Sequence, residues 1–191
     1  MADPARHILN AAKAGSRHGG PSFALANRVE RAAFAIVWLL CARWTPPMLF
    51  RWRALILRIF GAGLGINCRV HASAQIWLPR HLAFGENVLI GPGVILYNIA
   101  RIAIGDDAVI SQRAHLCTGS HDLDDLDFQL IAHPIAIGAK AWVAAEAFVG
   151  PGVTLGEGAV ALARAVIVKD VDPWTVHAGN PARQVRDRKP C

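Results

Sequence analysis

The chain has 191 residues, 53% of them hydrophobic, which is enough apolar material for one folded domain, and it carries a formal net charge of +6. Its four cysteines lie far apart and form no Cys-x-x-Cys pair, which argues against a disulfide framework and a zinc ribbon and favours a cytoplasmic location. The pI is about 9.7, but no nucleic-acid motif appears, so we expect the phosphates of a cofactor or an acidic membrane surface, and no nucleic acid, as partners.

The first part of the chain predicts a tail and then a helix. Residues 1–22 are small, polar and glycine-bearing, so we expect a mobile tail. From Phe23 to Arg43 the pattern is helical and includes an apolar run of eleven residues, 32–42. This run is too short to cross a bilayer, which takes about 20 residues, and it starts too late for a signal peptide.

A second helix is predicted after Pro46 and Pro47 and ends near Gly61, so that helices occupy residues 23–61. One interpretation is that both helices pack on the end of the following domain or on a neighbouring subunit, where they cover open strand edges. The other is attachment to a membrane surface through tryptophans and arginines. The two interpretations are not exclusive.

Residues 62–173 repeat every six positions, with two apolar columns four residues apart. The leading column contains Ile66, Ala72, Leu78, Phe84, Ile90 and Leu96, then, after a two-residue slip, Ile104, Ile110 and Leu116, and finally Ile137, Val143, Val149, Leu155, Ala161 and Ile167. A strand has a period of two and a helix one of about 3.6, so a period of six indicates a superhelix with one hexapeptide per flat face. Three faces close a coil, and the sequence predicts an all-β solenoid of about five triangular coils.

Glycines and turn signals support the same conclusion. Glycine often follows the leading aliphatic residue, as at Gly105 and Gly138, where each face must bend into the next. A β-sandwich would instead need irregular spacing and Asn-Gly hairpins between its strands, which do not appear at the right places. Residues 174–191 follow the last repeat as a C-terminal extension.

The repeat is interrupted once, by residues 122–136, which include an acidic stretch. The repeat resumes after them, so these residues are predicted to form an external loop, and loops on a rigid scaffold often carry functional sites. His121 stands at the base of this loop. Imidazole can accept a hydroxyl proton near neutral pH, which makes His121 the candidate general base.

Two further runs carry a resemblance: Cys117-Thr-Gly-Ser-His-Asp122 and Ala178-Gly-Asn-Pro-Ala-Arg183. With the hexapeptide repeat they resemble the hexapeptide acyltransferases, in particular the colanic acid biosynthesis acetyltransferases and, more distantly, the galactoside and maltose acetyltransferases. The resemblance implies a left-handed parallel β-helix, a handedness that the repeat itself does not determine.

The resemblance also implies an activity: direct transfer of an acetyl group from acetyl-CoA to a saccharide hydroxyl, with His121 as base and no metal. Cys117 is the alternative nucleophile of a two-step mechanism, but a small residue after a repeat aliphatic is usually structural. Ala145 stands where relatives carry a serine that stabilises the oxyanion, so this chain can offer only a backbone N–H there.

The implied binding sites are less well defined. The resemblance assigns the cofactor to a groove between subunits of a homotrimer, at Trp142, Ala144, Ala145, Ala163, Lys169, Arg183 and Arg186. Arg164 and Val168 depart from the family pattern, which usually has a small residue and a threonine at these positions. For the acceptor we expect contacts from Asn98, Tyr97 and Asp122.

Two other functions remain open on the sequence. A carbonic anhydrase uses the same superhelix and binds zinc through three histidines, but the spacing of His115 and His121 does not suit it. A non-catalytic trimeric scaffold would need no loop histidine. The favoured prediction is an acetyltransferase located in the cytoplasm or on the cytoplasmic face of the membrane.

Overall fold

The computed structural model describes residues 8–14 and 22–190 of the chain. The rest of the predicted mobile tail, residues 1–7 and 15–21, lies outside the described residues. Residues 8–14 make contacts with the rest of the chain. Ile8 forms an antiparallel bridge with Phe23, Leu9 N donates to Ser22 O at 2.9 Å, and a 3₁₀ turn follows at Ala11–Ala14.

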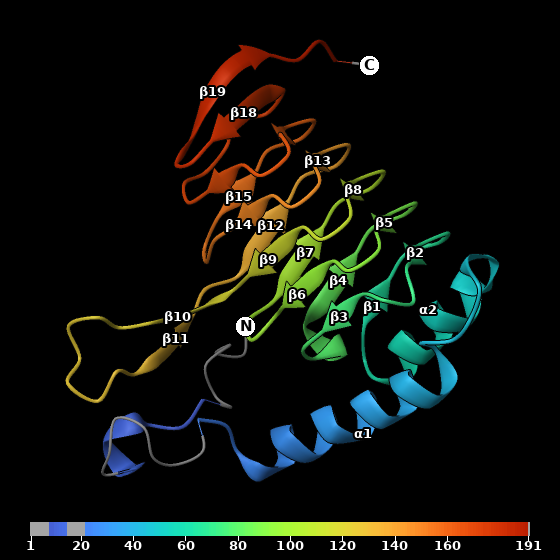
Figure 1. The fold of residues 1–191 in the computed structure, drawn as a ribbon, viewed down its shortest axis with the longest axis vertical. Helices are drawn as coiled ribbons and strands as arrows, with labels where there is room; N and C mark the ends of the chain where they lie inside the picture. The colour runs from blue at the N-terminus through green and yellow to red at the C-terminus, as the bar shows by residue number, and fades with distance from the viewer. Residues whose placement is uncertain (1–7, 15–21, 191) are drawn as a thin grey trace.

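The two predicted helices are present and lie at one end of the molecule (Figure 1). They are α1 (Leu25–Cys41) and α2 (Phe50–Ile59), joined through a 3₁₀ turn, η2 (Pro47–Leu49). The side of α1 that carries Phe34 and Trp38 is buried, and Ile56 and Leu57 of α2 join the same core cluster. Arg53 is 2% exposed and donates to Val70 O, at 2.7 Å, and to the carbonyls of Pro46 and Pro47. This arginine therefore fastens the turn between the helices to the first coil.

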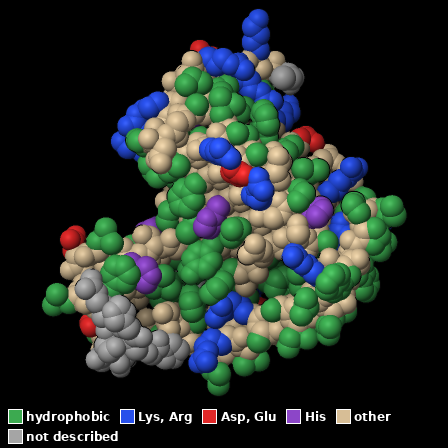
Figure 2. All heavy atoms as spheres, viewed as in Figure 1, with side chains coloured by type: hydrophobic (Ala, Val, Ile, Leu, Met, Phe, Trp, Pro, Cys, Tyr) green, Lys and Arg blue, Asp and Glu red, His purple; other side chains and the backbone are tan. Residues whose placement is uncertain are grey.

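The opposite side of the two helices is apolar and exposed. Its large side chains are Ile36, Leu39, Leu40, Trp44, Met48, Leu49, Trp52, Leu55 and Ile59, and we call them the outer helical face. Hydrophobic side chains gather over the two helices, along the lower right margin of Figure 2. Neither helix is long and apolar enough to cross a bilayer, and the same holds for every helix in the described residues.

Three parallel sheets form the solenoid (Figure 1). The first contains β1 (Gly63–Leu64), β4 (Leu82–Phe84), β7 (Ile102–Ile104), β12 (Ile135–Ile137) and β15 (Thr154–Leu155). The second contains β2 (Arg69–Val70), β5 (Leu89–Ile90), β8 (Val109–Ile110), β13 (Trp142–Val143), β16 (Val160–Ala161) and β18 (Thr175–Gly179), with β19 (Ala182–Asp187) antiparallel at its edge. The third contains β3 (Gln75–Ile76), β6 (Ile95–Tyr97), β9 (His115–Cys117), β14 (Phe148–Val149) and β17 (Val166–Ile167).

The apolar side chains of the six-residue repeat form the core of this solenoid. From Phe84 onward, the leading column and its companions four residues later are buried along the axis, as the sequence predicted, with the exception of Ser120, which is exposed on the hairpin. Five three-stranded coils are followed by part of a sixth, in which Val171 bridges Leu155 and β18 extends the second sheet. The predicted count of five was therefore short by this last partial turn.

The predicted register of the first coil was wrong. Leu64, Val70 and Ile76 pair with Phe84, Ile90 and Leu96, in place of the predicted Ile66, Ala72 and Leu78. Ile66 is 69% exposed. A 3₁₀ turn, η3 (Pro79–His81), adds two residues to this coil, so the two-residue slip occurs here as well as after Leu96.

The glycines act partly through close approach of successive coils. A Cβ on Gly138 would lie 2.5 Å from Glu157 N in the next coil, although the φ of Gly138 is not positive. At Gly158 φ is +65°, and a Cβ would also lie 2.4 Å from the Trp174 ring. Stacking distance, more than the bend itself, therefore excludes a side chain at Gly138.

The interruption of the repeat forms an antiparallel hairpin, β10 (Gly119–His121) and β11 (Leu130–Ala132), which projects sideways from the solenoid in Figure 1. Thr118 lies at its base with no exposed surface. The Thr118 hydroxyl donates to Tyr97 O at 2.8 Å and accepts from Ala100 N at 3.0 Å. On both sides of the hairpin the ladder stays in register, since Ile102 pairs with Ile135.

Candidate active site

His121 ends the first hairpin strand and is held by the far side of the loop. Its Nδ1 lies 2.7 Å from Phe128 O, and its ring stacks on the Phe128 ring with centroids 4.1 Å apart and planes at 10°. A carbonyl can only accept a hydrogen bond, so Nδ1 carries a proton, and in the neutral imidazole the lone pair is then on Nε2. This tautomer is the one that a general base acting through Nε2 requires.

The loop between the hairpin strands is closed by its own backbone. Asp122 N donates to Gln129 O at 2.9 Å, and Phe128 N donates to Asp125 O at 3.0 Å. Phe128 has a φ of 54°, in the left-handed region that bulky residues seldom adopt. This backbone conformation belongs to the turn that brings the Phe128 carbonyl and ring to His121.

The three predicted acceptor residues have different environments. Asp122 is exposed beside His121, where its carboxylate accepts from Asp124 N. Tyr97 is half-buried, with its ring edge-on to Trp77 at 5.0 Å. Asn98 is fully buried: its Oδ1 accepts from Trp77 N and Leu78 N, and its Nδ2 donates to Leu78 O. Asn98 therefore joins two coils, and its predicted contact with an acceptor stays a prediction.

Cys117 and His115 lie on β9, one strand before the hairpin. Burial raises the pKa of the Cys117 thiol, and the thiol donates to Gly119 O at 3.3 Å. Since a thiol attacks as the thiolate, this environment disfavours Cys117 as a nucleophile. The His115 ring packs edge-on against Phe148 at 5.4 Å, and burial lowers the pKa of His115, as expected of a structural histidine.

Four predicted cofactor positions lie along the second sheet and its following corner. Trp142 of β13 is 42% exposed, and its indole N–H donates to Ser111 Oγ at 2.9 Å. Ala144 is buried and donates from its backbone to Ala161 O. Ala145 and Ala163 occupy matching places in successive coils, and Ala163 is exposed. Their small side chains leave this corner open to a ligand.

The same corner explains how the chain accommodates Arg164, which departs from the family pattern. Arg164 has a φ of 61°, and its guanidinium points to Glu146, with Nε 2.6 Å from Oε2. Arg113 of the preceding coil contacts the other oxygen of Glu146. A hydrogen bond from Arg164 and the charge of Arg113 lower the pKa of the Glu146 carboxyl. The three side chains form an ion-pair ladder along the outside of the corner.

Two predicted phosphate ligands come together near the end of the solenoid. Lys169, after β17, and Arg183, on β19, line one hollow of about 300 Å³. Lys and Arg side chains gather over β18 and β19, at the top of Figure 2. Arg186 does not line this hollow and donates to Asp187 O. Lys169 and Arg183 can therefore serve one anion together, whereas Arg186 lies apart.

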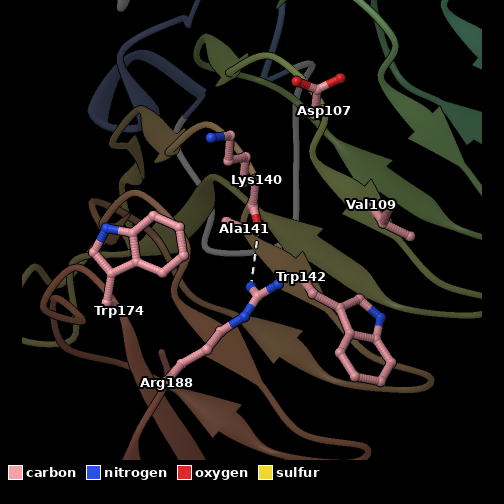
Figure 3. Close-up of a pocket in the computed structure, with 7 residues that line it drawn as sticks. All are labelled: Asp107, Val109, Lys140, Ala141, Trp142, Trp174 and Arg188. Carbon is pink, nitrogen blue, oxygen red and sulfur yellow. Dashed lines mark hydrogen bonds between the residues drawn. The ribbon is translucent and has the colours of Figure 1, made fainter. Parts of the chain in front are cut away.

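A second hollow, of about 480 Å³, contains Trp142 together with residues that sequence reasoning did not single out (Figure 3). The Arg188 guanidinium lies between the indoles of Trp142 and Trp174 in that view. It donates to Lys140 O at 3.1 Å and Gly158 O at 2.9 Å. The sequence did not single out Arg188, because no motif or spacing places it beside Trp174, whose ring centroid lies 5.7 Å from the guanidinium carbon.

The carbonic anhydrase alternative would require a set of side chains that bind a metal ion. Among the residues described, no three His, Cys, Asp or Glu side chains are grouped so that they could hold a metal ion. The carbonic anhydrase alternative therefore has no set of ligands within this part of the chain.

Comparison with known proteins gives the family. No family model matches the chain. This chain is 45% identical to the protein named colanic acid biosynthesis acetyltransferase WcaF of Escherichia coli strain K12. The match covers 76% of this chain and 80% of that protein. The chain is 28% identical to galactoside O-acetyltransferase of that organism, over 62% and 63% of the two chains.

A solved structure has the same fold. It is a hexapeptide-repeat acetyltransferase of Vibrio cholerae complexed with acetyl coenzyme A, with a TM-score of 0.80 and 23% identity over 95% of this chain and 100% of that chain. The predicted left-handed parallel β-helix is thereby confirmed. On the 45% identity, the chain belongs to the colanic acid biosynthesis acetyltransferases, a family with the hexapeptide-repeat fold.

Proposed function

We propose that this protein transfers the acetyl group of acetyl-CoA to a hydroxyl of a saccharide, directly and with His121 as general base. The observation that carries the proposal is the imidazole whose Nδ1–H is directed at Phe128 O, which leaves Nε2 as the proton acceptor. The relatives named for colanic acid biosynthesis and for galactoside O-acetylation support a saccharide acceptor.

The reaction follows from this geometry. Nε2 removes the acceptor hydroxyl proton as the oxygen attacks the thioester carbonyl, and a tetrahedral oxyanion forms. Its collapse breaks the carbon–sulfur bond, and the imidazolium returns the proton to the departing CoA thiolate. The products are an acetyl ester and CoA, and the backbone N–H of Ala145 is the proposed oxyanion donor.

The cofactor would lie along the corner of the second sheet. The open corner at Ala145 and Ala163 suits a narrow pantetheine arm, and Lys169 with Arg183 supplies positive charge for CoA phosphates. Trp142 would contact the cofactor from the adjoining strand. Since these positions are open on a single chain, we propose a homotrimer in which a neighbouring subunit closes the groove.

The outer helical face suggests where the enzyme works. It combines exposed tryptophans with Arg43 and Arg51, and we propose that it rests on the cytoplasmic face of an anionic membrane. An acceptor attached to lipid would be presented at that surface. Packing of this face on another subunit is the competing arrangement.

The decisive experiment is His121→Ala, with His133→Ala, an exposed histidine of the same loop, as its control. A general base contributes about 10²- to 10⁴-fold, so kcat with a saccharide acceptor should fall by that factor. The affinity for acetyl-CoA, measured by calorimetry, should not change. If His121→Ala keeps more than about a tenth of wild-type kcat, general-base catalysis by this residue is wrong.

A further inference from the structure

The N-terminal segment is hydrogen-bonded to the loop that holds His121. Gln129 follows Phe128 directly, and its Oε1 accepts from Ala11 N at 2.7 Å. Its Nε2 donates to Leu9 O at 3.2 Å and to Leu130 O at 2.9 Å. Both N-terminal partners are backbone groups of fixed polarity, so they determine which way the amide faces.

The segment that Gln129 grips is itself fixed to the body of the protein. Leu9 N donates to Ser22 O, and Ile8 bridges Phe23. Phe23 is 8% exposed and packs in one cluster with Ile99 of the solenoid and Leu130 of the hairpin. Residues 8–11 therefore lie between the start of α1 and the loop and tie the two together.

The contact with residues 8–11 is made by Gln129, which is next to Phe128, the residue that orients His121. Phe128 supplies both the carbonyl and the ring that hold the imidazole. Gln129 is fixed on its other side as well, because its backbone oxygen accepts from Asp122 N, which follows His121. A shift of Gln129 would thus move the Phe128 carbonyl and release the Nδ1–H of His121.

We propose that Gln129 and residues 8–11 form a clamp that positions His121 for catalysis, with Gln129 as a positioning residue. This inference rests on the proposed role of His121 as the base. An imidazole turned away from its productive orientation loses rate while the distant cofactor contacts stay intact, since misplacement by about 1 Å can cost up to about 10²-fold.

Two substitutions break the clamp in different places. Gln129→Met keeps the side-chain length and removes all three amide hydrogen bonds. Ala11→Pro removes the one N–H that donates to Gln129, at the first position of a 3₁₀ turn where proline is tolerated. Gln129→Glu keeps an acceptor for Ala11 N and should lie between wild type and Gln129→Met. Gln75→Met, at an exposed glutamine on β3, is the matched control.

The clamp is tested by kinetics and by amide hydrogen exchange on the full chain. Gln129→Met should lower kcat by about tenfold or more, with the KM for acetyl-CoA within about twofold of wild type. Exchange at the amides of Asp122 and Phe128 should become faster. Ala11→Pro should change both measurements in the same direction and by less. The double variant should be no worse than Gln129→Met, because the one hydrogen bond that Ala11→Pro removes is among the three that Gln129→Met removes.

The outcomes separate the clamp from the proposed function. Unchanged exchange in Gln129→Met would show that the clamp does not hold the loop. Faster exchange with wild-type kcat would show that it holds the loop without positioning the base. Either result overturns the inference while leaving the role of His121 intact. If His121→Ala retains activity, the proposed function fails instead, and the exchange data still report on the clamp.

Discussion

Replacing Asn98 by alanine tests whether this residue binds the acceptor or joins two coils. The side chain is fully buried and makes three hydrogen bonds to the backbone of the preceding coil. Two of these backbone groups have a second partner: Trp77 N also donates to Leu96 O, and Leu78 O also accepts from His81 N. Leu78 N would be left without its partner in a site that is 1% exposed.

The expected cost follows from that count. An unpaired buried N–H costs about 1–3 kcal/mol, and each of the two remaining lost bonds contributes about 0.5–1 kcal/mol. We therefore expect Asn98→Ala to lower the free energy of unfolding by about 3 kcal/mol. For a chain of this length that corresponds to a fall in Tm of about 6–12 °C.

The assay is thermal unfolding at one protein concentration, combined with acceptor kinetics on the same preparations. Asp122→Ala is the comparison, because Asp122 is exposed and its loss should change stability by no more than about 0.5 kcal/mol. If Asn98→Ala keeps the wild-type Tm and raises the KM for the acceptor by more than about tenfold, Asn98 contacts the acceptor and the structural argument is wrong.

Three further predictions concern assembly, membranes and pH. Light scattering at micromolar concentration should give a trimer, and a monomer would contradict the shared cofactor groove. The protein should co-sediment with anionic liposomes at low salt, and the double substitution Trp44→Glu, Met48→Glu should abolish this binding. If the wild-type protein stays in the supernatant, the outer helical face packs on another subunit instead. Burial lowers the pKa of His115, so the unfolded chain binds the proton more readily than the folded chain. The free energy of unfolding should therefore fall as pH drops below about 6.5. If a His115→Phe variant shows the same dependence of stability on pH, this residue is not the cause.

The repeat, and the place of His121 where the repeat is interrupted, could be predicted because both depend on strict spacing. Each face of the solenoid consumes six residues, and burial of one side chain per face repeats that number in the sequence. His121 was recognisable because the repeat stops just after it and resumes in register. Tertiary contacts were not needed for either prediction.

The register of the first coil could not be predicted from the column alone. Leu78 and Ile66 are aliphatic and continue the six-residue count backward from Phe84, yet the 3₁₀ turn at Pro79–His81 shifts the true column by two. Leu78 is buried just before that turn, so an apolar residue at this position is compatible with either register. Pairing between strands, rather than composition, determines which count is correct.

The support of His121 was also beyond sequence reasoning. Gln129 contacts Ala11 across 118 positions of the chain, and neither residue belongs to the repeat. The two large aliphatic side chains of residues 8–14 are adjacent and belong to no periodic pattern, and residues 1–22 as a whole are small, polar and glycine-bearing, so the sequence favoured a mobile tail over a docked segment. Contacts made by single polar side chains at long range leave no periodic signal.

The active-site hairpin stands at a corner that is irregular in three successive coils. Eight positions separate Ile76 from Phe84, and eight separate Leu96 from Ile104, where six is the regular spacing between neighbouring faces. At the next coil the same corner, after Leu116, carries the whole hairpin.

A polar side chain from the following coil supports each of the first two enlarged corners. Asn98 bonds back to the corner at Trp77 and Leu78, and Thr118, twenty positions later, bonds back to Tyr97 and Ala100. The hairpin therefore begins from a backbone that is already fixed, while strand pairing on the other faces continues past it. Because the corner lies outside the repeating core, it could accept an insertion large enough to carry His121 without disturbing the register of the strands that carry the proposed cofactor residues.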